Sequence, residues 1–251
     1  MKRVYLIGFD LCGGLALHRY FIANGYDATF DDEDGFSSVA MENFQQGQPL
    51  LKGFENCSFF SQIQHETADG AYVYTNELLL EEFYKQEPSA LYVFNYQPLD
   101  NWLESRQRFY GYLPKVMKRE QLDEQQVLAL WRQAYVNHKT RVLELLAGKT
   151  NFFMYDYAEH NFSELNSFFK SHGIAVDESK YQPVAEIRGS IEQRFHIQNI
   201  REAALYFRYH RFDIDTAINL LAEAERHQPC RYYFKDELKK WKLEKATWTK
   251  E

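Results

Sequence analysis

The chain has 251 residues, of which 45% are hydrophobic and 17% aromatic, and its formal net charge is −7. This length and apolar content predict one large folded domain, or a domain with a helical appendage, and exclude a largely disordered chain. The negative balance disfavours a general surface for nucleic acid or for an anionic membrane.

The first predicted elements are a buried strand, a glycine turn and an amphipathic helix. Residues 4–7 form a continuous apolar run that ends at Gly8, which is typical of a strand covered on both faces. A glycine pair follows, and an apolar helical stripe then continues as far as Asn24. A second short strand is expected over residues 26–30, ahead of an acidic run.

The middle of the chain alternates between short strands and helices, although residues 35–70 show no clean period. Strands are predicted at 71–75, 91–94 and 151–155, and helices at 77–85, 98–109, 122–146 and 163–171. This alternation predicts an α/β fold with a mainly parallel central sheet flanked by helices.

The C-terminal part changes character and is predicted to be helical. Helical patterns cover residues 191–209, 214–226 and 232–243. We therefore expect an α/β domain over residues 1–178 and a helical extension over 179–251 that packs on the same domain. Its aromatic stripes are expected to pack in a core or in a homodimer.

Cysteine usage and the N-terminus both point to a cytoplasmic protein. The three cysteines are far apart and no pair has CxxC spacing, which favours neither a disulfide framework nor a zinc site. The first apolar run is broken by Asp10 and is too short for a signal peptide or a membrane span.

The stretch GFDLCGGLAL, which begins at Gly8, has the layout of a phosphate-binding loop. Backbone N–H groups at a glycine turn and at a helix N-terminus can hold a phosphate. The stretch resembles the first loop of the P-loop sulfotransferase family, of the form Gly-x-Pro-Lys/Arg-Ser/Thr/Cys-Gly-Thr-Thr/Ser-x-Leu. Gly8, Cys12, Gly13 and Leu17 match that form.

Two later stretches extend the resemblance. In LYVFNYQPLDNWLESRQRFYG, Trp102, Leu103 and Ser105 fall into the family's pattern, and Gln97 stands where the family has an arginine. Residues 131–174 are similar to the family's later helix–strand–helix segment. Together the stretches cover about residues 1–178 in the family's order, which implies a P-loop-type three-layer fold.

Membership of this family implies binding of 3′-phosphoadenosine 5′-phosphosulfate. It also implies transfer of the sulfuryl group to a hydroxyl or amine of a small molecule or glycan, assisted by a general base. The cofactor-binding residues that the resemblance implies are Gly8, Asp10, Leu11, Cys12, Gly13, Gly14, Leu15, Gln97, Ser105, Arg188 and Gly189. The candidate bases are Asp31, Asp32 and His65.

Several of these positions depart from the family's pattern. Leu11 and Gln97 stand where cations are expected, and Asp10 is predicted to repel a phosphate. Each lost charge-assisted hydrogen bond costs about 1.5–3 kcal/mol, so cofactor affinity is expected to fall by orders of magnitude. Arg106 or Arg108 could replace a missing cation, although helix geometry points both away from Ser105.

Each candidate also has a simpler interpretation. The glycine turn could be a tight strand–helix connection that binds nothing, and Asp31 and Asp32 could belong to an acidic loop in water. His65 could be a solvated loop histidine. Cys12, near a helix N-terminus, could be a thiol of depressed pKa or a small buried side chain.

Three hypotheses on function follow. The first is a sulfotransferase, and the second is a catalytically inactive relative that has lost the cofactor-binding cations and serves for binding or scaffolding. The third is a dinucleotide-binding oxidoreductase, drawing on Gly8, Gly13 and an aspartate about twenty residues later. It ranks last because the G-x-G-x-x-G spacing is absent.

Overall fold

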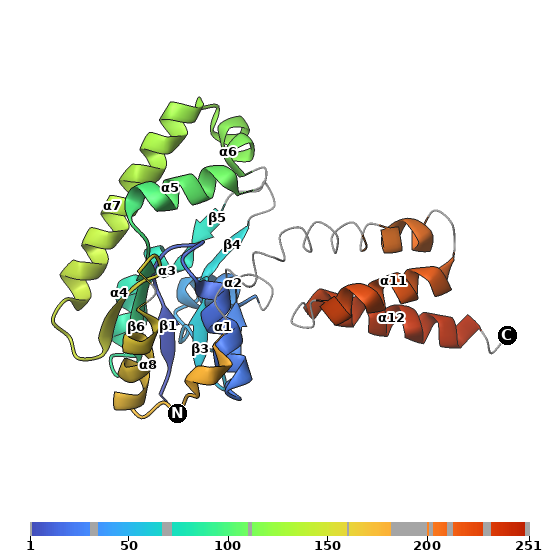
Figure 1. Ribbon diagram of the computed structural model, residues 1–251, viewed down its shortest axis with the longest axis horizontal. Helices are drawn as coiled ribbons and strands as arrows, with labels where there is room; N and C mark the ends of the chain where they lie inside the picture. Colours follow the sequence, from blue (N-terminus) through green and yellow to red (C-terminus); the bar gives the residue numbers. More distant parts are fainter. Residues whose placement is uncertain are drawn as a thin grey trace. The chain divides into compact units, whose positions relative to one another are not determined.

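The computed structural model describes residues 2–30, 35–66, 72–109, 112–159, 161–181, 200, 203–209, 213–227 and 232–248. The chain divides into two compact units, Met1–Gln182 and Pro183–Glu251 (Figure 1).

The first unit is built on a five-stranded sheet in the order β2-β3-β1-β6-β7. All four neighbouring pairs are parallel. The strands are β1 (Val4–Leu6), β2 (Ala28–Phe30), β3 (Phe59–Ser61), β6 (Leu91–Tyr96) and β7 (Phe152–Asp156). The predicted α/β fold with a parallel central sheet is therefore confirmed.

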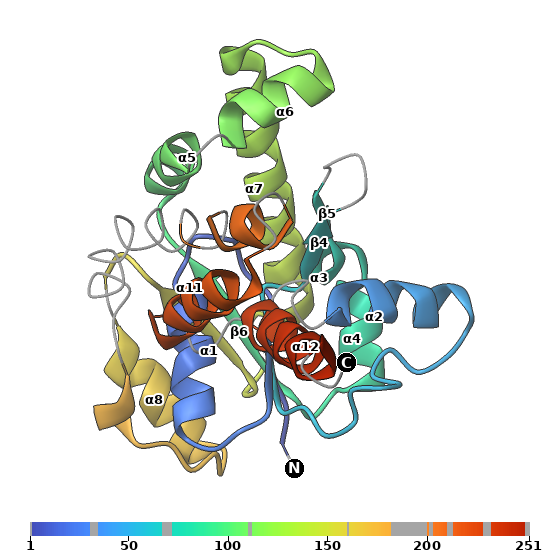
Figure 2. The same ribbon diagram turned by 90° about the vertical axis from the view of Figure 1, so that its right-hand side faces the viewer.

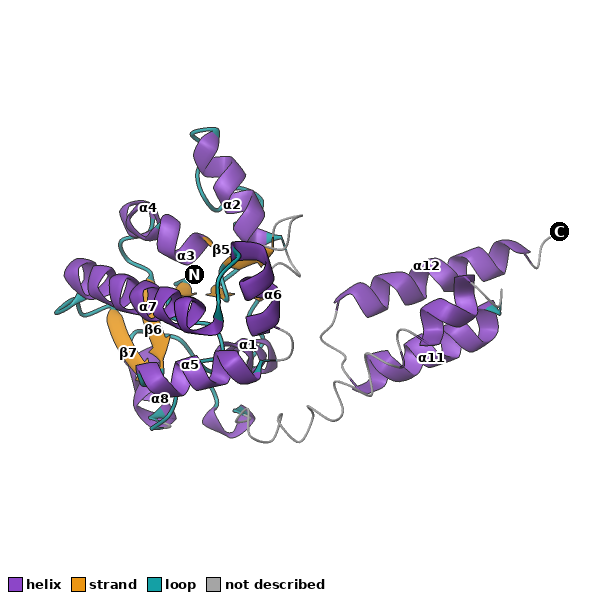
Figure 3. Cartoon of the chain, turned by 90° about the horizontal axis from the view of Figure 1, so that it is seen from above, coloured by secondary structure: helices purple, strands orange, loops and turns teal. Residues whose placement is uncertain are grey.

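Helices cover both faces of this sheet, as Figure 3 shows. One face packs against α1 (Gly14–Ala23) and α8 (Phe162–Ser171). The other packs against α2 (Phe36–Gln45), α4 (Leu80–Gln86), α5 (Leu99–Arg108), α6 (Tyr112–Glu120) and α7 (Glu124–Leu146). The central strand serves both layers, because alternate side chains of a strand point to opposite faces.

Aromatic side chains fill much of the core between these layers. Tyr5 of β1 stacks on Phe60 of β3 and Tyr92 of β6, with ring centroids 4.8 and 5.5 Å apart. On the opposite face Phe21 stacks on Phe59 at 4.0 Å. Such contacts between neighbouring strands and helices hold the sheet in register.

A small hairpin stands beyond the sheet. Strands β4 (Gln64–Glu66) and β5 (Tyr72–Tyr74) pair antiparallel beside α2 and the short helix α3 (Thr75–Leu78), as Figure 2 shows. Because β4 follows β3 closely, the hairpin lies at the carboxyl edge of the sheet. A 3₁₀ turn at Glu178–Lys180 closes the described part of this unit.

Some helices and strands of the structure were not predicted from the sequence. Residues 35–70 hold α2, β3 and β4, although no element was predicted there. Each strand has three residues, too few for a periodic signal, and α2 buries the polar side chains of Ser37 and Asn43. Helix α6 was also missed; its Pro114 is its third residue, where the first turn tolerates proline.

The second unit is helical in all its described residues. Helices α11 (Ile214–His227) and α12 (Tyr232–Trp248) pack with residues 203–209 around Leu221, Leu238 and Trp241. The two predicted helices at 214–226 and 232–243 are confirmed. Of the helix predicted at 191–209, residues 203–209 are helical, and residues 191–199 lie outside the described residues. None of the described helices combines the length and the apolar content needed to span a membrane.

Candidate functional site

The β1–α1 connection lies where the sheet's topology opens a crevice. From β1 the chain leads through α1 to β2 on one side, whereas from β6 it leads through α5–α7 to β7 on the other side. In open α/β sheets, ligands bind outside the carboxyl ends of strands at such a switch point. Residues 8–13, here called the β1–α1 loop, occupy this position.

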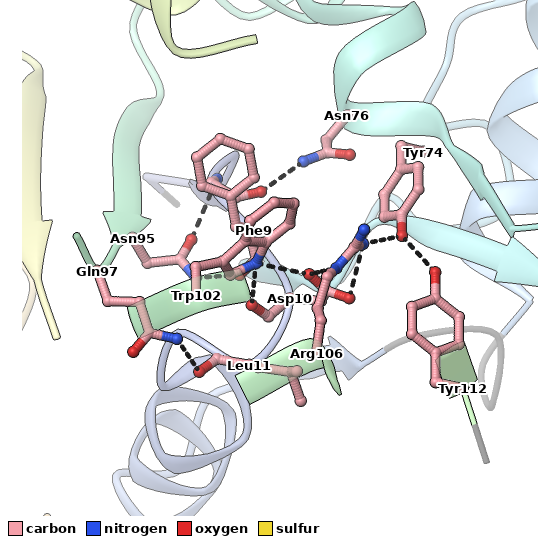
Figure 4. Close-up of polar contacts among 11 residues, drawn as sticks. Phe9, Asp10, Leu11, Tyr74, Asn76, Asn95, Gln97, Trp102, Arg106 and Tyr112 are labelled. Carbon is pink, nitrogen blue, oxygen red and sulfur yellow. Dashed lines mark hydrogen bonds and ion pairs between the residues drawn. The ribbon is translucent and has the colours of Figure 1, made fainter. Parts of the chain in front are cut away.

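Asparagine side chains hold the first part of this loop. Asn95, near the end of β6, donates from Nδ2 to the carbonyl oxygens of Phe9 (2.9 Å) and Cys12 (3.2 Å), and its Oδ1 accepts from the Gly8 N–H. Asn76 donates from Nδ2 to the Gly8 carbonyl at 3.0 Å (Figure 4). Two neighbouring elements thus fix the loop's path.

The remaining two carbonyl groups of the loop's first five residues are also bonded by side chains. Trp102 Nε1 lies 3.2 Å from the Asp10 oxygen, and Gln97 Nε2 lies 3.5 Å from the Leu11 oxygen. Every carbonyl from residue 8 to residue 12 therefore faces a side-chain donor from outside the loop.

The backbone N–H groups of residues 11–15 have a different situation. In the part of the chain that the structure describes, none of them donates to a protein acceptor. Leu11 and Gly13 adopt left-handed backbone conformations, with φ of 58° and 80°. Left-handed residues alternating with right-handed ones turn successive N–H groups into a concave, anion-binding arrangement.

Two of the three glycines of this stretch are required by space. A Cβ at Gly8 would lie 1.9 Å from the carbonyl oxygen of Asn95. A Cβ at Gly13 would lie 2.6 Å from the ring of Tyr157, and the positive φ adds strain. Gly14 has no such neighbour, since the nearest atom would be 3.6 Å from its Cβ.

The carboxylate of Asp10 is paired inside the protein. Arg106 donates from Nε to Oδ1 (3.2 Å) and from Nη2 to Oδ2 (3.0 Å), and Trp102 Nε1 donates to Oδ1 at 3.0 Å. The side chains of Arg106 and Asp10 are only 4% and 11% exposed. The expected unpaired charge that would repel a phosphate is thus absent, because Arg106 neutralises it.

Aromatic rings enclose the guanidinium of Arg106. Its Cζ lies 4.2 Å from the ring of Trp102 and 5.0 Å from that of Trp131, with Tyr112 and Tyr74 at 5.3 and 5.5 Å. The hydroxyl of Tyr74 also accepts a hydrogen bond from Nη2. Burial lowers the pKa of Arg106, but Asp10 and the two tyrosines together raise it above its usual value.

These contacts leave the charge of Arg106 fully engaged with the protein. Arg108, the other arginine considered as a substitute cation, forms a surface pair with Glu104. Gln97 is 7% exposed and donates from Nε2 to Ser105 Oγ at 3.2 Å. The implied cofactor residues Gln97 and Ser105 are therefore brought together by a neutral hydrogen bond.

Cys12 is fully buried, and burial, reinforced by Asp10, raises the pKa of its thiol well above the ordinary value. The interpretation of Cys12 as a thiol of depressed pKa is therefore wrong, and the alternative of a small buried side chain is confirmed. Leu15 is half-buried on the first turn of α1.

The candidate base His65 lies in β4 and not in a solvated loop, so that simpler interpretation is wrong. Its Nδ1 is 3.1 Å from Ser37 Oγ, which is 2.6 Å from Thr75 Oγ1. Ser37 therefore occupies Nδ1 of the half-buried His65 ring, and Nε2 takes no part in this hydrogen bond. Four further candidates, Asp31, Asp32, Arg188 and Gly189, lie outside the described residues.

The structure adds a titratable group that the sequence analysis did not identify. Burial raises the pKa of Glu77 in α3 to about 7, against the opposing effect of Arg106. Asn76, next to it, bonds the loop. No pattern in the sequence singles out Glu77, because an acidic residue in the first turn of a helix is ordinary.

No protein-family model matches the chain, and no match was found among the curated proteins. The fold and the loop therefore define the class: an α/β protein with an all-parallel five-stranded sheet and a glycine-containing connection at its carboxyl edge. Chemically, this connection offers N–H donors that have no acceptor among the described residues, beside a buried, internally neutralised ion pair.

Proposed function

We propose that this protein binds an anionic group of a phosphorylated or sulfated ligand at its β1–α1 loop, as a sulfotransferase-like binding protein of P-loop type without transfer activity. One observation carries the proposal. The carbonyl groups of residues 8–12 all face side-chain donors, while the N–H groups of residues 11–15 have no described acceptor.

Two further features support binding. Backbone N–H groups at the start of a helix of ten residues add the positive end of the helix dipole to the hydrogen-bond donors. The pairing of Asp10 with Arg106 removes the strongest objection to an anion at this place.

Transfer chemistry is less well supported, because it needs cations that offset charge developing on the leaving phosphate. Leu11 and Gln97 are neutral, and Arg106 is occupied by Asp10 and Tyr74. Without such groups a multiply charged cofactor loses about 1.5–3 kcal/mol for each missing charged hydrogen bond.

The second candidate is sulfuryl transfer from 3′-phosphoadenosine 5′-phosphosulfate, and the environment of His65 favours it. With Nδ1 held by Ser37, Nε2 could take the proton of an acceptor hydroxyl as the oxygen attacks sulfur. Adenosine 3′,5′-bisphosphate would then leave, and its release with 4-nitrophenol as acceptor measures this activity.

Calorimetry with adenosine 3′,5′-bisphosphate and with inorganic sulfate tests binding. Gly14→Pro removes one N–H at the first helical position, and it also shifts the turn, because proline disfavours the ψ of 5° that Gly13 has before it. Gly14→Ala keeps that N–H and adds only a Cβ that has room. We expect Gly14→Ala to bind like the unaltered protein and Gly14→Pro to bind about tenfold more weakly or worse.

Equal affinities of the two variants, with circular dichroism showing both folded, would refute the use of these N–H groups. A gain-of-function variant gives an independent test. Leu11→Lys, which places a cation in the loop, should raise the affinity for the bisphosphate at least about tenfold.

A further inference from the structure

We propose that the β1–α1 loop selects singly charged ester anions, sulfate esters and phosphodiesters, over doubly charged phosphate monoesters. This inference rests on the proposed function, since it names the class of ligand for the same loop. The feature behind it is the buried pair of Asp10 and Arg106, which leaves the loop without net side-chain charge.

The pair of Asp10 and Arg106 is held on all sides. Three hydrogen bonds join the Asp10 carboxylate to Arg106 and Trp102, at 3.0–3.2 Å. The remaining faces of the guanidinium meet aromatic rings, and Nη2 also donates to the Tyr74 hydroxyl. A guanidinium held in this way cannot turn toward a ligand, so its charge neutralises the charge of Asp10.

Other charged groups lie near the pair. Glu77 interacts electrostatically with both Arg106 and Asp10, and it adds a negative charge when it ionises. Arg141, which also acts on Glu77, is paired with Glu81 at the surface. The charges of Asp10, Arg106, Arg141 and Glu81 therefore cancel, and ionisation of Glu77 makes the sum negative.

Two further cations lie on helices that frame the loop. Lys139 Nζ is 4.8 Å from the ring of Tyr96, and Arg19 lies five residues beyond Gly14 on α1. Both side chains are half-exposed, so water and salt screen their charges far more than those of a buried pair.

The free-energy cost of taking an ion out of water rises with the square of its charge, so a dianion costs about four times as much as a monoanion of the same size. The helix N-terminus offers roughly half an elementary positive charge. N–H donors and this partial charge can balance one negative charge far better than two.

The test compares ligands that share an aryl group and a tetrahedral ester but differ in charge. At pH 8 the probes are 4-nitrophenyl sulfate and 4-nitrophenyl methyl phosphate, both monoanions, and 4-nitrophenyl phosphate. The last is a dianion there, because the second pKa of phosphate monoesters is about 6. We expect calorimetry to give both monoanions at least about fivefold tighter binding than the dianion.

Two variants change the charge in opposite directions. Asp10→Asn keeps the shape and leaves Arg106 with a net positive charge, and it should raise dianion affinity about tenfold and reverse the preference. Arg106→Gln should weaken every probe, the dianion most. A merely structural role of the pair would instead weaken all probes in both variants. Arg132→Gln removes the arginine of the exposed pair between α7 and Asp100 of α5, and it should leave the preference unchanged.

The unaltered protein alone decides the inference if either variant fails to fold. A dianion that binds as tightly as the monoanions would overturn the selectivity, while its binding would still support the proposed function. Failure of all three probes and of inorganic sulfate to bind would refute the proposed function itself and this inference with it.

Discussion

Two ion pairs link helix α5 to other elements, one on its buried side and one on its exposed side. Arg106 meets Asp10 with side chains only 4% and 11% exposed, whereas Asp100 meets Arg132 with side chains 86% and 54% exposed. The N–O distances are similar, at 3.0 and 3.2 Å. Because the distances are so similar, we expect the difference in burial, and not the distance, to decide how much each pair contributes to the free energy of unfolding.

The largest contrast is expected when the arginines are replaced by methionine. Arg106→Met leaves the Asp10 carboxylate buried with Trp102 as its remaining donor. We expect the free energy of unfolding to fall by about 3–5 kcal/mol, since an uncompensated buried charge is costly. Urea denaturation followed by circular dichroism measures it, with Arg132→Met as the matched control. A loss below about 1 kcal/mol would mean that the two sides of α5 do not differ.

Trp102→Phe sharpens the comparison by keeping an aromatic ring, although a smaller one, and removing the indole donor. The Nε1 hydrogen bonds to the Asp10 carboxylate and carbonyl disappear, while the ring can still cover Arg106. We expect a loss of about 1.5–3 kcal/mol in unfolding free energy, the usual value for a hydrogen bond to a charged group. An unchanged denaturation midpoint would show that Arg106 alone holds Asp10.

Glu77 adds a pH dependence to the buried side. Burial raises its pKa to about 7 from an ordinary 4.5, so the folded state favours the protonated form. Below pH 4.5 the side chain is protonated in both the folded and the unfolded state and does not lower the free energy of unfolding. As pH rises through about 7, its ionisation lowers the free energy of unfolding. Glu77→Gln should therefore be roughly 1–3 kcal/mol more stable than the unaltered protein at pH 8. The difference in stability between Glu77→Gln and the unaltered protein should vanish near pH 4. Denaturation curves at both pH values measure it, and a larger difference at pH 4 than at pH 8 would contradict the prediction.

The smallest effect is expected on the exposed side. Asp100→Asn removes a surface pair that water and salt already screen, and we expect a change below about 0.5 kcal/mol. The same denaturation experiment, repeated at high salt, should reduce even this difference. A loss comparable to that of Arg106→Met would contradict the comparison.

The sequence was sufficient for elements whose signal is local. An apolar run, glycines and a helical stripe over the first 24 residues predicted β1, the loop and α1, and the strand–helix alternation predicted the parallel sheet. The three-residue strand β3 and the polar helix α2 gave no comparable period, so the pairing of β3 with the central strand became visible only in three dimensions.

The site was less predictable because its decisive contact joins distant residues. Arg106 stands among polar neighbours on α5, and its partner Asp10 is 96 positions away in the chain. Charge and spacing in the sequence therefore predicted that Asp10 would repel a bound phosphate, and they did not predict its pairing with Arg106. Asn95 did offer a signal, since an amide inside the apolar run LYVFNY has to find partners when it is buried.

The aromatic rings around Arg106 also make this part of the molecule accessible to tryptophan fluorescence. The chain has four tryptophans, and the indoles of Trp102 and Trp131 both face the same guanidinium. Because indole emission responds to nearby charge, any shift of Arg106 or of the loop that it anchors changes the intrinsic fluorescence. The protein thus carries its own optical sensor beside the loop, and titrations need no attached dye.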